Sequence, residues 1–115
     1  MRPATVDLHN HTAGDTWEGI TVGPVEINEA APSGAVDSCR MSFRSKSNKT
    51  LGQTLSSGTE ITIDDADTWE FTVDPIILTM EAGSYDYDFE VTDVTGVVRT
   101  IYKGTFNLIL DTTNA

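Results

Sequence analysis

The sequence predicts an all-β fold, an antiparallel β-sandwich of about seven or eight strands with an extended N-terminal arm. Segments of alternating apolar and polar residues recur along the chain, as expected of half-buried strands. Turn-forming residues separate these segments about every ten residues, which is the spacing of sandwich strands. Helical periodicity is nearly absent. The 115 residues suffice for one core, so we expect an arm over residues 1–14 and a single sandwich domain over residues 15–115.

The first strand is expected over Trp17–Asn28, with Ile20 and Val22 on one face. Gly23-Pro24 then shifts the register, so that the apolar set continues at Val25 and Ile27. A Gly-Pro pair fits a bulge on an edge strand, because proline has no N–H to donate to a ladder.

Each later strand is expected to turn one apolar face to the core. The inward residues are Cys39, Met41 and Phe43; Ile61 and Ile63; Trp69, Phe71 and Val73; Tyr85, Tyr87, Phe89 and Val91; and Phe106, Leu108 and Leu110. Thr54-Leu55 is a weaker strand candidate, and Val97–Lys103 is a further one. The sequence Gly83-Ser84-Tyr85 at the start of a strand is frequent in immunoglobulin-like sandwiches, which makes this the expected type.

One segment, Asp74–Ala82, is apolar without alternation and contains Pro75 near its start. Proline suits the first position of a helix. We therefore expect Pro75–Glu81 to form a short helical turn between the two sheets.

The formal net charge of −11 restricts the partners of this chain. An acidic protein is repelled by phosphate backbones and anionic lipid, so neither nucleic acid nor a membrane is an expected partner. Residues 1–14 are polar and lack the apolar stretch of a secretory signal, so we expect the chain to be made in the cytoplasm and not to be exported by that route. The single cysteine, Cys39, lies between apolar neighbours and is expected to be a buried, inert thiol.

Catalytic or metal-binding constellations are hard to find. His9-Asn10-His11 with Asp15 has the spacing of a hydrolase metal pair, but a zinc site needs further ligands, so two exposed histidines in an arm explain it better. The Asp64-Asp65-Ala66-Asp67 turn has the oxygen ligands that calcium takes, yet a solvated acidic surface is the simpler interpretation. No serine nucleophile motif accompanies either histidine. We expect no enzyme, no catalytic residue, no metal and no cofactor.

Partner binding and internal ion pairs are the remaining interpretations of the polar residues. Arg40 and Arg44 face outward on their strand as Asp86 and Asp88 do on theirs, so neighbouring strands would form cross-strand ion pairs. Trp17 lies beside the arm and is a candidate partner anchor or a core residue, because tryptophan serves both roles. With Trp17, the arm residues His9, His11 and Asp15 form the candidate partner-binding set. Trp69 belongs to an apolar face and is expected in the core.

Short motifs follow one another from residue 14 to residue 113. They are Gly14-Asp15-Thr16-Trp17, Cys39-Arg40-Met41-Ser42-Phe43-Arg44, Leu78-Thr79-Met80-Glu81-Ala82-Gly83-Ser84-Tyr85-Asp86-Tyr87-Asp88, Gly96-Val97-Val98-Arg99-Thr100, Lys103-Gly104-Thr105-Phe106 and Asp111-Thr112-Thr113. In this order the chain resembles small virion proteins of tailed bacteriophages and prophages. That group includes the N-terminal immunoglobulin-like domain of baseplate upper proteins.

The resemblance implies a virion structural protein, made in the host cytoplasm and located in the virion. It implies an adaptor or attachment subunit of the tail, baseplate or fibre, docked to other virion structural proteins in an oligomeric assembly. Three alternatives stay open: a capsid decoration (cement) or head-fibre protein, a carbohydrate-binding β-sandwich module, and a small hydrolase. A carbohydrate-binding module would need an exposed aromatic platform, and a hydrolase would need catalytic groups that the sequence does not display.

Overall fold

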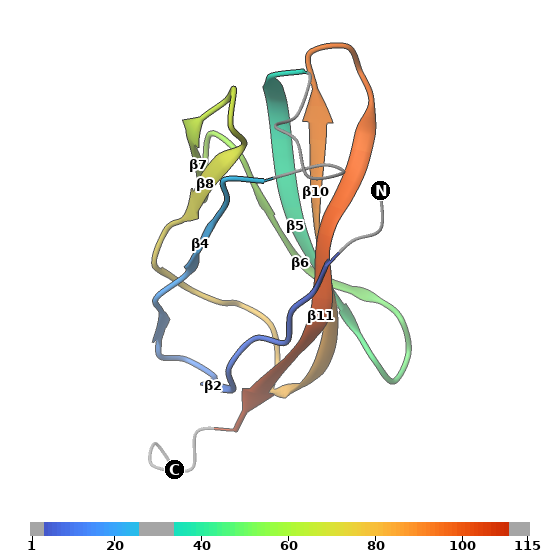
Figure 1. Cartoon of the computed structure of the whole chain (residues 1–115). Coiled ribbons are helices and arrows are strands. Elements are labelled where there is room, and N and C mark those ends of the chain that lie inside the picture. Colours follow the sequence, from blue (N-terminus) through green and yellow to red (C-terminus); the bar gives the residue numbers. More distant parts are fainter. Residues whose placement is uncertain (1–3, 26–33, 111–115) are drawn as a thin grey trace.

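The computed structural model describes residues 4–25 and 34–110, and these residues form strands and connecting loops without a helix (Figure 1). The strands are β1 (Ala4–Thr5), β2 (His11–Thr12), β3 (Thr16–Trp17), β4 (Ile20–Val22), β5 (Val36–Ser45), β6 (Leu51–Ser56), β7 (Ile61–Asp65), β8 (Glu70–Val73), β9 (Ile76–Ile77), β10 (Gly83–Asp93) and β11 (Val98–Ile109). The predicted all-β sandwich is confirmed. The predicted strand Trp17–Asn28 is split, and Val97–Lys103 is continuous with the strand that carries Phe106 and Leu108, as β11.

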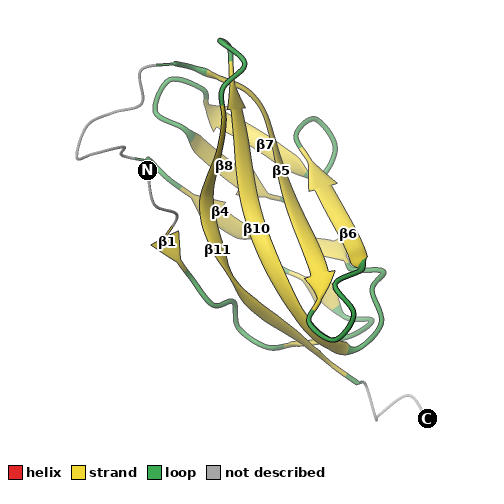
Figure 2. Cartoon of the chain, turned by 90° about the vertical axis from the view of Figure 1, so that its right-hand side faces the viewer, coloured by secondary structure: helices red, strands yellow, loops and turns green. Residues whose placement is uncertain are grey.

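Two sheets form the layers of the sandwich. The large sheet has the order β1-β11-β10-β5-β6, with β2 also pairing with β11. Its central strand β10 is antiparallel to both β5 and β11, and these long strands lie side by side in Figure 2. The small sheet, in the order β4-β8-β7, lies opposite it in Figure 1. A separate ladder pairs β3 with β9.

The core lies between the sheets and is strongly aromatic. The ring of Phe71 on β8 lies 5.3 Å from that of Phe89 on β10, which joins the two layers. Phe43 and Trp17 both pack against Phe106, at 5.4 and 5.7 Å. Each fully buried side chain of this size contributes about 1.5–3 kcal/mol. The alternation predicted for β5, β8 and β10 therefore describes the core faces correctly.

The helical turn predicted for Pro75–Glu81 is wrong. Ile76-Ile77 instead forms β9, which pairs with Thr16-Trp17. Leu78 and Met80 are buried while Ile77 is 55% exposed, so the segment does alternate. The alternation is hidden in the sequence because the outward positions also carry an apolar residue.

Leu110 was expected in the core, but it is 68% exposed and lies beyond the end of β11. The inward face of that strand ends at Leu108, since the core ends there. The expected first strand Trp17–Asn28 is broken after Trp17, and β4 ends at Val22, directly before Gly23-Pro24. Val25 is buried as predicted, and the prediction for Ile27 lies outside the described residues.

Candidate binding site at one edge of the large sheet

The two edges of the large sheet differ in what covers them. Along β11, the N-terminal arm runs parallel to the strand and pairs with it at β1 and β2. The amides of Val6, Leu8 and Ala13 donate to carbonyls of β11 at 2.8, 2.9 and 2.8 Å. The chain itself therefore protects this edge, which we call the β11 edge.

The opposite edge is formed by β6, which pairs with β5 on one side and with no strand on the other among the described residues. Its sequence, Leu-Gly-Gln-Thr-Leu-Ser, contains neither charge nor proline. Edge strands are commonly protected by charges, prolines or bulges, and here only the register shift opposite Phe43/Arg44 serves this purpose. We call Leu51–Leu55 the β6 edge.

The hydrogen-bonding direction of Thr54 follows from its neighbours. The Ser57 amide donates to the Cys39 carbonyl at 2.9 Å, so these two residues form a hydrogen-bonded pair. Such pairs alternate with non-bonded pairs along an antiparallel ladder. Thr54, opposite Ser42, therefore turns its N–H and C=O away from β5. Ser56 is the next residue whose N–H points away from β5, and this N–H already donates to the Glu60 carboxylate at 3.0 Å.

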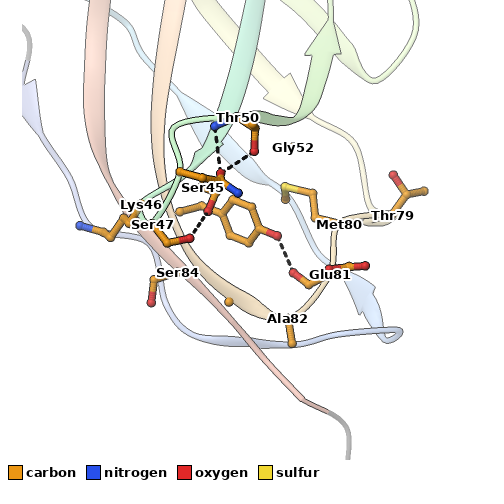
Figure 3. A pocket seen from close by; sticks show the side chains of 13 residues that line it. Ser45, Lys46, Ser47, Thr50, Gly52, Thr79, Met80, Glu81, Ala82 and Ser84 are labelled. Atoms are coloured by element: carbon orange, nitrogen blue, oxygen red, sulfur yellow. Dashed lines mark hydrogen bonds between the residues drawn. The ribbon is translucent and has the colours of Figure 1, made fainter.

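A pocket of about 760 Å³ adjoins the start of the β6 edge (Figure 3). One wall is the β5–β6 turn, residues 46–50, and the other is the segment that leads into β10. Met80 and the ring of Tyr85 are its apolar groups. Hydroxyls of Ser45, Ser47 and Thr50 lie around them. The pocket thus combines an apolar base with many hydrogen-bonding groups.

Internal hydrogen bonds hold both walls of this pocket. The Asn48 side-chain oxygen accepts from the Thr50 amide at 3.1 Å and from its hydroxyl at 2.6 Å. On the opposite wall, the Tyr85 hydroxyl donates to the Glu81 carbonyl at 2.5 Å, as in the tyrosine corner of sandwich folds. Burial first, and then the charge of Glu81, raise the pKa of Tyr85, so the phenol stays protonated. The pocket is therefore preorganised.

Ion pairs cross the outer face of the large sheet. β5 and β10 are neighbours, as the cross-strand hypothesis required, and Arg40 binds Glu90 at 2.9 Å. Arg44 stands opposite Asp86 in the register, but Asp86 pairs with Lys46 at 3.1 Å and Lys49 at 3.8 Å. Such exposed pairs contribute about 0–1 kcal/mol each.

Charges are unevenly distributed between the sheets. Every Lys and Arg among the described residues lies on β5, on the turn that follows it, or on β11. The small sheet has only carboxylates, Asp64 and Asp65 on β7 and Glu70 on β8. Two of them accept hydrogen bonds from threonine hydroxyls, since Thr72 donates to Asp64 at 2.6 Å and Thr68 to Glu70 at 2.5 Å. Positive charge is thus confined to the large sheet.

The candidate partner-binding residues predicted from the sequence do not belong to the β6 edge. Trp17 is only 7% exposed and packs in the core, so its indole offers a partner almost no surface. His9 and Asp15 are exposed, and the His11 ring nitrogen Nε2 lies 2.9 Å from the Asp15 carbonyl oxygen. Partner binding by these residues stays a prediction. Trp69 is fully buried as expected, and its indole N–H donates to the Gly34 carbonyl at 2.7 Å.

The described part of the chain bears on the metal sites considered from the sequence. Among residues 4–25 and 34–110, no three His, Cys, Asp or Glu side chains are grouped closely enough to hold an ion. Asp65, which the calcium interpretation included, instead accepts hydrogen bonds from the amides of Asp67 and Thr68 at 3.0 and 3.3 Å. In the same part of the chain, no helix is long and apolar enough to cross a membrane.

The β6 edge is a candidate binding site that the sequence did not predict. Thr54-Leu55 was only a weak strand candidate, although Leu51–Ser56 is an uncharged run between turn residues, and that signal was present. The pocket had no such signal. Its two walls are about thirty residues apart in the chain and meet only because β5 and β10 pair.

No family model and no curated protein matches this chain. Among solved structures, it matches CopC from Methylosinus trichosporium OB3b at 18% identity, over 94% of this chain and 84% of that one, with a TM-score of 0.47. We draw no argument about function from a likeness of this size.

The assignment to virion proteins of tailed bacteriophages is wrong, and the virion role, the virion location and the capsid-decoration alternative are wrong with it. None of the comparisons gives a phage protein: no family model or curated protein matches, and the matching structure named above is CopC. The motifs have local structural explanations. Gly14 occupies a turn at a φ of 91°, and Glu81 and Tyr85 form the corner described above. Sandwich folds in general need such features, so the motifs do not identify a family.

Proposed function

We propose that this chain is a non-catalytic binding module that takes an extended segment of a partner protein as an additional strand on the β6 edge. The observation that carries the proposal is the contrast within one sheet, where the arm covers β11 and, among the described residues, β6 pairs with β5 alone. An added strand would bond to the outward N–H and C=O of Thr54. Main-chain hydrogen bonds then supply affinity with little dependence on sequence.

The adjoining pocket would supply specificity. Side chains of an added strand alternate between faces, and one near Gly52 would reach the pocket. Its Ser and Thr hydroxyls favour a polar side chain that both donates and accepts hydrogen bonds, and the Tyr85 ring favours one with an apolar stem.

The partner's overall charge follows from the charge of the module. A net charge of −11 favours a partner that is basic outside the pairing segment, and disfavours nucleic acid and anionic membranes. An assembly of this acidic chain with basic protein neighbours is therefore the expected context.

The test compares two substitutions at one position. Thr54→Pro removes an outward N–H and leaves the bonds to β5 intact, whereas Thr54→Val retains that N–H. Peptides selected from a random library against the wild-type protein should bind T54P about tenfold more weakly and bind T54V unchanged. Unfolding in urea should show T54V within about 0.5 kcal/mol of the wild type, and T54P less stable, because its ring fixes φ, but still folded.

Hydrogen exchange locates the binding. A bound peptide should slow exchange of the Thr54 amide and leave the amides of β7 unaffected. Equal binding to wild type and T54P, or protection confined to another strand, would overturn the proposal.

A further inference from the structure

The β11 edge has a second property, because it is shaped for one particular extended segment. A Cβ atom on Gly104 would lie 2.1 Å from the carbonyl oxygen of Val6, so only glycine lets the arm approach this closely. The Tyr87 hydroxyl, from the neighbouring strand, donates to that same carbonyl. Two features of the sheet thus converge on one peptide group of the arm.

Side chains of the arm are also recognised individually. The Asp7 carboxylate accepts from both the amide and the hydroxyl of Thr105, each at 3.1 Å. Asn107 donates its side-chain amide to the Asn10 side chain at 3.2 Å. Leu8 packs against the core. Together with Gly104 and Tyr87, these groups make a seat for one sequence, and we call it the arm seat.

The arm joins the sandwich through an open turn at Gly14. Gly14 has a φ of 91° and open space around it, and the Asp15 amide donates to the Thr12 carbonyl at 3.2 Å. Most of the arm is exposed. Val6 is 42% exposed, and only Leu8 is half-buried among residues 5–10. Apart from Leu8, the arm therefore buries little apolar side-chain surface of its own.

We infer that the arm seat is an exchange site, which takes the arm of a second copy of this chain in place of its own. Every contact of the seat is identical whether the arm comes from the same chain or from another, so exchange loses only the turn contacts of Asp15 with His11 and Thr12. Reciprocal exchange joins two chains through two arms. The balance is set by protein concentration against the effective concentration of the tethered arm, which is of millimolar order for a short connection. The inference concerns the β11 edge and is independent of the β6 proposal.

Two single cysteine variants test the exchange on the full chain. Asn10→Cys places a thiol on the arm and Asn107→Cys places one on the seat, at two side chains that touch in the structure. When the two variants are mixed at about 1 mM and oxidised mildly, N10C should crosslink to N107C. The native Cys39 will not compete, because it is 5% exposed and burial raises its pKa to about 11.

The matched control replaces the seat position by an exposed threonine of the small sheet. A mixture of N10C with Thr62→Cys measures random collision, and the N10C–N107C dimer should exceed it about tenfold, as judged by non-reducing electrophoresis and mass spectrometry. The double variant N10C/N107C, oxidised when dilute, should close within one chain and then remain monomeric at high concentration. A crosslink yield equal to the control, with the double variant closing normally, would show that the arm stays on its own chain and would overturn the inference.

Discussion

The β11 and β6 edges belong to the same sheet but differ in what pairs with them. At β11, the chain fills the edge with its own arm, and the fit depends on a glycine at residue 104 and on the hydroxyl of Tyr87. At β6, the outward groups of Thr54 face no strand in the described part of the chain. The difference teaches that stability and the proposed binding are separable here, because substitutions at the β11 edge should destabilise the protein and substitutions at the β6 edge should mainly weaken the proposed complex.

The largest effect is expected from one methyl group placed at each edge. Gly104→Ala drives a Cβ against the Val6 backbone and should destabilise the protein by about 2–3 kcal/mol. Gly52→Ala, on β6, meets the Met80 sulfur at 2.8 Å and the Tyr85 ring at 3.0 Å. Both are side chains rather than backbone and can shift, so its cost should be smaller, about 1 kcal/mol. Urea unfolding of both variants gives the comparison. Equal costs would show that the arm is not held as described.

Alkaline pH should release the arm from the β11 edge. Burial first, followed by the charge of Asp7 and the proximity of Tyr102, raise the pKa of Tyr87 to about 12. The Tyr87 phenol of the unfolded chain ionises near pH 10, so between pH 10 and about 12 the folded protein keeps a proton that the unfolded chain has lost. The contribution of this phenol to stability is therefore fully present below pH 10 and is lost as the pH rises through about 12.

Tyr87→Phe isolates this contribution. It removes the hydroxyl donor and should cost about 1 kcal/mol at neutral pH, while its stability should fall less than that of the wild type between pH 10 and 12. Denaturant unfolding at both pH values provides the measurement. Parallel pH profiles for the two proteins would rule out a role for this phenol.

The smallest effect is expected between the edges, on the outer face of the sheet. Arg40→Glu replaces the ion pair with Glu90 by a like-charge pair and should cost about 0.2–1 kcal/mol at low salt. The cost should shrink at 1 M salt because these side chains are exposed to solvent. Thermal unfolding at the two ionic strengths checks this, and an effect that does not depend on salt would mean that the arginine stem matters more than its charge.

The sequence predicts the features that depend on local alternation of apolar and polar residues. It does not predict contacts between segments that lie far apart in the chain. Phe43, Phe71 and Phe89 could be placed in the core because their neighbours alternate with them. The arm could be predicted as extended, but not its docking, since Gly104 is indistinguishable in sequence from a turn glycine. Which strands end up at an edge depends on the order of pairing, and no single segment contains that information.

Among the described residues, Lys and Arg are confined to β5, its turn and β11, which gives the molecule an electric dipole. The small sheet, with Asp64 and Glu70, is its negative pole. A basic partner of the kind proposed above would therefore be drawn toward the small sheet before any contact forms. Raising the salt concentration should weaken both this attraction and the orientation that it favours.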